Sequence, residues 1–229
     1  MKRFSQDFKN NLSQAISKAE EKTLCEIIPI ITKKSHHYPL PESILIIFFS
    51  VIFILIYQFL LTYYFNQNEF IFFDSHENEI FLFKFLNYQI LAGFCGALFG
   101  FLLSYIPQIE RCLISKKEMQ LMVESNAYRA FFEHKLHLTK NHSAMLIYFS
   151  LFERKIVILT DESLSKTIPA KLWDDLLLST QEQVKEIGLE KALIELLEQS
   201  SNVLAHYFPR NDPKQNSENE HEDQVIFQN

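Results

Sequence analysis

Two long, uncharged apolar runs constrain this 229-residue chain more than any other feature of its sequence. The first extends from Ser43 to Tyr64, and the second extends from Tyr88 to Ile106, just before Pro107. A helix of about 20 residues spans the roughly 30 Å of a bilayer's hydrocarbon core. Buried core helices of a soluble protein can have similar runs, but two runs with tyrosines near their ends favour a membrane. We therefore expect a hairpin of transmembrane helices over 43–64 and 88–106.

Cationic residues flank the outer ends of this hairpin and are absent from the stretch 65–80, which carries four acidic residues. The flanking cations are Lys33, Lys34, Arg111, Lys116 and Lys117. Loops rich in Lys and Arg usually stay in the cytoplasm. Both termini should therefore be cytoplasmic, and 65–87 should be a short external loop.

The rest of the chain alternates helical and strand patterns on both sides of the hairpin. Apolar residues at three- and four-residue spacing predict helices, and short aliphatic runs predict strands. The expected helices span 4–23, 115–132, 170–186 and 189–207, and the expected strands span 25–32, 144–151 and 155–160. Only a short turn separates the last two strands, which predicts a β-hairpin. Pro29 cannot donate a ladder hydrogen bond, so its strand should lie at an edge or contain a bulge.

A single helix and strand before the membrane are too small to bury their own apolar faces. The segment 1–35 should therefore pack on 115–210 as one α/β domain that the transmembrane hairpin interrupts. The final segment, 211–229, is rich in Asn, Glu, Asp, Gln and Ser, and only Val225, Ile226 and Phe227 are apolar. This composition predicts an acidic, disordered tail.

Carboxylates stand at two of the predicted strand ends. Asp161 and Glu162 directly follow the strand 155–160, and Glu26 opens the strand 25–32. In α/β sheets, ligand-binding loops lie at strand ends, and carboxylate oxygens suit Mg²⁺ or Ca²⁺. The competing interpretation, which we favour, is that these residues are solvated caps.

Two other charged groups allow similar alternatives. Glu133, His134 and His137 have the side chains of zinc ligands. They lie at a predicted helix end, however, where histidine also caps terminal carbonyls, and capping or domain docking is the favoured interpretation. Glu153 and Arg154, in the turn of the β-hairpin, are expected to form a surface pair rather than a phosphate clamp.

The second apolar run contains small residues at helical spacing. Gly93, Gly96 and Gly100 permit close approach of another helix, and Gly96 and Gly100 form a GxxxG pattern. Packing against the first apolar helix is favoured over dimerisation. Because neither run contains an ionisable residue, a transport path is poorly supported.

Several common function classes lack their signatures in this sequence. We find no Gly-rich phosphate loop and no Ser or Cys nucleophile in a recognisable elbow motif. The net charge of -6 and the lack of a basic stripe argue against nucleic acid as a partner. Cys25, Cys95 and Cys112 have no metal-site spacing, and no disulfide is expected. The expected partners are the lipid bilayer and another protein.

Six segments together carry a likeness to a known family: Ala19–Pro29, Phe131–Thr139, Leu146–Arg154, Val157–Asp161, Trp173-Asp174 and Leu204–Pro209. They resemble the TPM-domain membrane proteins of bacteria and cover nearly all of the soluble part. The resemblance implies a three-layer α/β/α domain, here interrupted by the transmembrane hairpin. It also implies a multi-pass protein of the bacterial inner membrane.

The sequence departs from this family at two places. Leu24-Cys25 stands where the family commonly has Ser-Gly, and Lys135 stands where it often has Gly between two histidines. A backbone that needs a positive φ at either place would be strained.

The resemblance leaves two classes of function open. The favoured class is a non-enzymatic protein-interaction module that assembles or maintains membrane complexes, because catalytic motifs are missing. The alternative is a metal-dependent phosphoester hydrolase. It would use Glu26, Asp161 and His134 or His137, with Ca²⁺ or Mg²⁺ as the cofactor.

Overall fold

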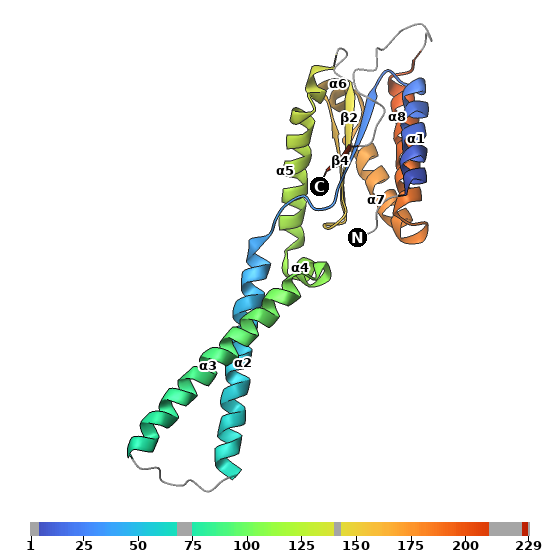
Figure 1. Cartoon of the computed structure of the whole chain (residues 1–229). Helices are drawn as coiled ribbons and strands as arrows, with labels where there is room; N and C mark the ends of the chain where they lie inside the picture. The colour runs from blue at the N-terminus through green and yellow to red at the C-terminus, as the bar shows by residue number, and fades with distance from the viewer. Residues whose placement is uncertain (1–4, 68–74, 140–142, 211–225, 229) are drawn as a thin grey trace. The chain divides into compact units, whose positions relative to one another are not determined.

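The computed structural model describes residues 5–67, 75–139, 143–210 and 226–228. The chain divides into two compact units (Figure 1). One unit combines Met1–His36 with Lys117–Asn229, and the other is His37–Lys116. The first unit contains the sheet, and the second contains the two long apolar helices.

The first unit is built on a four-stranded mixed sheet with strand order β3-β2-β1-β4. The strands are β1 (Glu26–Thr32), β2 (Ala144–Ser150), β3 (Lys155–Thr160) and β4 (Ile226–Gln228). β1 is parallel to both of its neighbours, whereas β2 and β3 form an antiparallel pair. The strand that precedes the long helices therefore pairs directly with the first strand that follows them.

Helices cover both faces of this sheet, and successive residues of β1 contribute to two different apolar clusters. Ile27 and Ile31 belong to the cluster shared with α1 (Gln6–Lys22), α7 (Ala170–Glu186) and α8 (Leu189–Tyr207). Ile28 and Ile30 belong to the cluster shared with α5 (Lys116–Glu133) and the 3-10 turn η1 (Leu136–Leu138). Figure 1 accordingly shows α5 on one side of the sheet and α1 and α8 on the other. Burial of both faces explains why β1 is a continuous aliphatic run.

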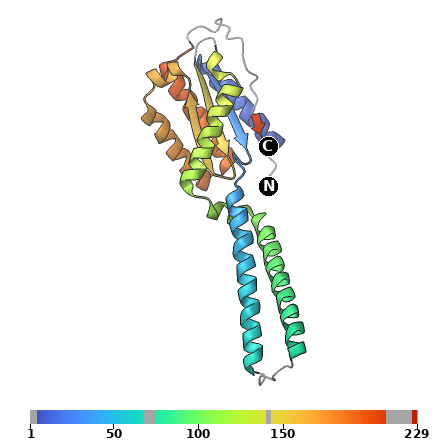
Figure 2. The ribbon, with the colours of Figure 1, turned by 90° about the vertical axis from the view of Figure 1, so that its left-hand side faces the viewer.

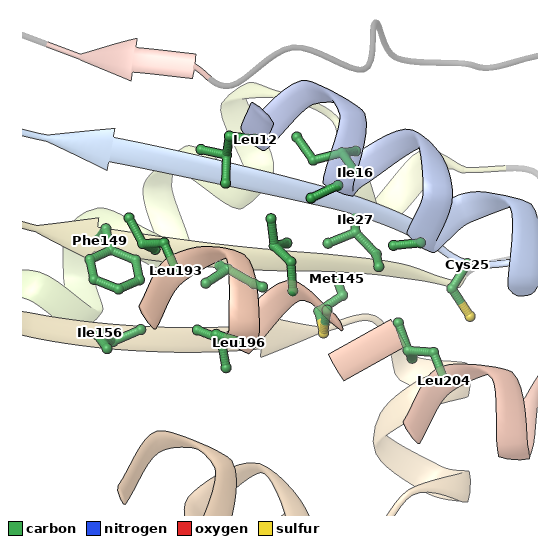
Figure 3. Packing of buried hydrophobic residues seen from close by; sticks show 14 of the residues in the cluster. Leu12, Ile16, Cys25, Ile27, Met145, Phe149, Ile156, Leu193, Leu196 and Leu204 are labelled. Atoms are coloured by element: carbon green, nitrogen blue, oxygen red, sulfur yellow. The ribbon is translucent and has the colours of Figure 1, made fainter. Parts of the chain in front are cut away.

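The cluster below α1 and α8 is the larger of the two (Figure 3). Leu12 of α1, Leu193 of α8 and Met145 of β2 are almost completely buried there. Full burial of such a side chain stabilises the fold by about 1.5–3 kcal/mol. Ser5 caps the start of α1 by accepting a hydrogen bond from the Phe8 N–H at 3.0 Å.

The second unit consists of α2 (Pro39–Gln67), α3 (Ser75–Ser104) and the short α4 (Pro107–Leu113). By length and composition, two of its helices can cross a bilayer: Pro39–Tyr64 and Phe85–Ser104, whose 18-residue apolar windows have mean hydropathies of 2.9 and 1.6. Only 6% and 11% of the residues in these two windows are buried. A core helix of a soluble protein would be mostly buried, so this exposure agrees with an apolar surrounding.

Helical structure extends into the stretch 65–87, where an external loop is expected. α2 continues to Gln67 and α3 begins at Ser75, so most of this stretch is helical. Charged residues limit the part of a helix that can enter lipid, but they do not end the helix itself. Similarly, Pro107 ends the apolar run and then occupies the first turn of α4, where its missing N–H costs nothing.

The C-terminal tail also differs from the sequence prediction. Ile226–Gln228 form the strand β4 instead of a disordered segment, whereas 211–225 lie outside the described residues. β4 pairs only with Ile30–Thr32 of β1. Within the described chain, Pro29 therefore has a strand neighbour on one side only, as its missing N–H predicts.

Candidate functional site

Glu26 begins β1 and Asp161 directly follows β3, and both residues lie at the same end of the sheet. The Asp161 N–H donates to the Ala144 carbonyl at 3.0 Å, and Ala144 is the register partner of Glu26. The two acidic residues are thus separated by β2, which places their strands about 10 Å apart. Because β3 is antiparallel, this end carries the amino ends of β1 and β2. The rule that ligands bind at the carboxyl ends of parallel strands does not apply here.

Asp161 and Glu162 serve the local helix α6 (Glu162–Thr167). The Asp161 side chain is the N-cap and accepts a hydrogen bond from the Glu162 N–H at 2.7 Å. Glu162 forms an exposed ion pair with Lys166 at 2.5 Å. Asp161 is therefore a cap, but it is only 8% exposed and so is not the expected solvated cap, whereas Glu162 is solvated and does not cap.

The predicted histidine group is spread over the end of α5 and the turn after it. Glu133 pairs with Arg129 at 3.0 Å on the surface of α5. His137 lies in η1, and its ring centroid is 5.0 Å from that of Phe132, while His134 lies in the turn between the two elements. Among the residues that the structure describes, no group of three or more His, Cys, Asp or Glu side chains is placed to hold a metal ion.

Lys135 has a positive φ, which strains a residue other than glycine. Lys135 adopts φ 55° and ψ 29°, the left-handed conformation that favours glycine. Such a conformation costs a non-glycine residue on the order of 1 kcal/mol or more. Leu24 and Cys25 are not among the positive-φ residues of the described chain, so no such strain arises there.

A buried polar group at the other end of the sheet, where β1 and β2 terminate, was not predicted. Glu153 is only 3% exposed, so the expectation of a surface pair with Arg154 is wrong. Its carboxylate accepts the Ser35 N–H at 3.1 and 3.3 Å and also accepts the Ser150 hydroxyl. These bonds tie the chain that leaves β1 to the turn between β2 and β3.

The same end of the sheet contains further buried polar side chains. The Thr32 hydroxyl donates to the Lys34 carbonyl at 3.2 Å. Tyr148 is almost fully buried, and this burial raises the pKa of its phenol, with a smaller contribution from the Glu153 carboxylate. We refer to Thr32, Ser35, Tyr148, Ser150 and Glu153 as the polar cluster. Its residues come from segments far apart in sequence, which explains why sequence patterns did not reveal it.

A cavity of about 510 Å³ opens beside the β2–β3 turn, toward α7 and α8. Its apolar lining includes Phe149, Leu151 and Ile156, and every charged residue that lines it is basic. These basic residues are Arg154, Lys155 and Lys185. The volume lies within the range of small-molecule sites, and the lining could take a ligand with an anionic group and an apolar part.

α5 carries a second apolar face that points away from the sheet. Leu121, Tyr128 and Phe132 are between 52% and 58% exposed. At about 100° per residue they lie within roughly 40° of one another on the helix, opposite the buried Met119, Val123, Ala127 and Ala130. Leu138 of η1 is also exposed. We call Leu121, Tyr128 and Phe132 the outer stripe of α5.

The glycines of α3 lie against α2. A Cβ atom on Gly96 would lie 2.3 Å from the Phe49 carbonyl oxygen, and one on Gly100 would lie 2.4 Å from that of Leu45. Gly93 is less crowded, and its carbonyl accepts the Ser50 hydroxyl at 2.9 Å. Gly96 and Gly100 therefore allow the two helix backbones to touch within one chain.

No family model matches this sequence, and no curated protein matches it. Among solved structures, the chain is similar to the NMR structure of protein BA42 from the psychrophilic bacterium Bizionia argentinensis. The TM-score is 0.57 at 15% sequence identity, and the alignment covers 99% of this chain and 97% of that one. At this identity the likeness concerns the fold alone.

Proposed function

We propose that this chain is a bacterial inner-membrane protein whose cytoplasmic α/β domain binds another protein through the outer stripe of α5. The domain is a TPM-like, three-layer α/β/α domain, and its role is the assembly or maintenance of a membrane complex. Helices on both faces of the sheet and the sequence resemblance support this assignment.

The outer stripe is the observation that carries the proposal. A helix at a protein surface normally has one apolar face, which it buries. α5 buries one such face against the sheet and presents a second one to solvent. Contiguous exposed apolar side chains mark interaction surfaces, and a helix face with anchors one and two turns apart fits a groove in a partner protein.

The location rests on the two long helices and on their flanking charges. Their length and hydropathy suit a bilayer. Lys33, Lys34 and Arg111 lie outside the apolar runs on the side of the α/β domain in sequence, and the positive-inside rule then assigns that domain to the cytoplasm.

In-cell photo-crosslinking tests the interaction. A photoreactive amino acid at Leu121 should give a discrete adduct with one partner, and Phe132→Asp in the same chain should abolish it. The matched control is Leu178→Asp, which alters an equally exposed leucine on α7. The interaction role is rejected if the adduct persists with Phe132→Asp, or if Leu178→Asp abolishes it equally.

Cysteine labelling tests the orientation. Cys112 is exposed in α4, and in a Cys95→Ser variant it should react in intact cells with a membrane-permeant maleimide but not with an impermeant one. Cys25 is buried and should stay silent. A Ser75→Cys variant that also carries Cys95→Ser and Cys112→Ser should react with both reagents once the outer membrane is permeable. Labelling of Cys112 by the impermeant reagent would show the reverse orientation.

A further inference from the structure

The outer edge of β1, on the side away from β2, differs along its length in which backbone N–H groups can pair with another strand. The Glu26 N–H points toward β2 and donates to the Ser143 carbonyl at 3.2 Å. The Ile27 N–H points the other way and donates to the Glu20 carboxylate of α1 at 3.1 Å. Because successive peptide groups of a strand alternate sides, Ile27, Pro29 and Ile31 face the outer edge.

Two of these three positions cannot accept another strand. The Ile27 N–H is already bonded to Glu20, and Pro29 has no N–H to donate. The third position, Ile31, can pair with a strand. It lies at the centre of the short ladder with β4, opposite its register partner Phe227. The outer edge is thus closed along its first half and open to a strand only at Ile30–Thr32.

Figure 2 shows β4 as a short arrow near the C-terminus, and its two apolar residues have different surroundings. Ile226 packs against the cluster beneath α5. The ring of Phe227 lies 4.8 Å from the ammonium group of Lys9 on α1, and its side chain is 38% exposed. The Ile30–Thr32 edge therefore fits a strand that runs parallel to β1 and has an aliphatic residue followed by an aromatic one.

We propose that the Ile30–Thr32 edge is a docking site for an extended peptide of a partner protein, and that β4 occupies it in the free chain. Main-chain pairing supplies affinity in such strand addition, and the alternating side chains supply specificity. The described part of β4 is three residues long, so a peptide with the same aliphatic–aromatic pair can compete with it. This site is separate from the outer stripe of α5 and does not depend on it.

The test uses the full chain in detergent and a fluorescent peptide with the sequence of residues 222–229. Ile226→Asp should displace β4 and open the edge, so peptide binding measured by anisotropy should be about tenfold or more tighter than in the unaltered chain, where the tethered strand competes at high effective concentration. A peptide with both apolar residues replaced by Asp should not bind. A chain that ends at Gln224 should bind like Ile226→Asp.

A disulfide that reversibly holds β4 on β1, called the lock below, provides a second test. Thr32 and Gln228 are register partners, and the spacing of neighbouring strands suits a disulfide. A chain with Thr32→Cys and Gln228→Cys, in a Cys95→Ser and Cys112→Ser background, should not bind the peptide when oxidised and should bind as weakly as the unaltered chain when reduced.

The outcomes separate this proposal from the one on α5. The docking site is overturned if neither Ile226→Asp nor the shortened chain binds the peptide, or if the oxidised lock binds it as the reduced form does. Tyr128→Asp combined with Phe132→Asp should leave peptide binding unchanged. If that double variant abolishes peptide binding while its unfolding midpoint is unchanged, the peptide binds the outer stripe instead.

Discussion

The two ends of the sheet both carry acidic residues, but the fold uses them differently. At the amino ends of β1 and β2, Asp161 caps a short helix and Glu162 makes an exposed ion pair. At the carboxyl ends, Glu153 is buried and accepts hydrogen bonds from Ser35 and Ser150. A carboxylate beside a strand therefore has no fixed meaning in sequence, because its role depends on the N–H and O–H groups that distant segments bring to it.

The largest expected effect is at the carboxyl end. Glu153→Ala should lower the free energy of unfolding by about 3 kcal/mol, because the Ser35 N–H and the Ser150 hydroxyl would lose a charged acceptor inside the fold. Urea unfolding followed by the fluorescence of Trp173, which is buried in this unit, measures the change. Glu153→Gln, which keeps the shape, should cost less. A loss below about 1 kcal/mol for the alanine variant would show that the buried carboxylate does not hold the turn.

The buried thiol of Cys25 should make stability at the amino end depend on pH in the alkaline range. Burial raises the pKa of Cys25 from 9.0 to about 11, against the opposing hydrogen bonds of Thr23 and Ser143. The unfolded thiol ionises first, so stability is intact below about pH 9 and falls as the pH rises through 11, by about 2–3 kcal/mol in total. The decline between pH 9 and 11 should be smaller in Cys25→Ala than in the unaltered chain. Equal slopes would contradict this assignment.

The smallest effects should come from the acidic residues at the amino end. Asp161→Ala should cost about 1 kcal/mol through the lost cap, whereas Asp161→Asn should cost almost nothing because asparagine caps equally well. Glu162→Ala, which removes only an exposed ion pair, should change the unfolding free energy by less than about 0.5 kcal/mol. Thermal unfolding of the three variants ranks these costs. An Asn variant as unstable as the Ala variant would mean that the charge of Asp161 matters more than its hydrogen bond.

Local patterns predicted most of the secondary structure because they contain the signals that end each element. α7 and α8 begin and end at the predicted residues, because Gly188 separates two segments of regular apolar spacing. Gly188 was expected as a C-terminal cap, but it is the N-cap of α8 and Ile187 is the C-cap of α7. The two long helices followed from the lack of charge in their apolar runs. β3 also has its predicted bounds.

The errors concern relations between distant segments. The predicted β-hairpin already implied that Asp161 lies beside the amino end of β2, where the carboxyl-end rule for parallel strands predicts no ligand site. The burial of Glu153 depends on Ser35, which is 118 residues away. The sequence did not predict β4, because three residues in a polar tail are too few to give a strand pattern on their own.

The pairing of β1 with β2 also determines when the sheet can form during translation, because β1 is synthesised long before β2. About 110 residues, including both long helices, separate the end of one strand from the start of the other. At about 5–20 residues per second, a ribosome needs roughly 5–20 s to make them. During that interval the aliphatic β1 has no neighbouring strand to pair with. The apolar face of α1 is also uncovered, because α8, against which it packs, has not yet been synthesised. The nascent N-terminal segment is thus an exposed, aggregation-prone strand that needs shielding until translation is nearly complete.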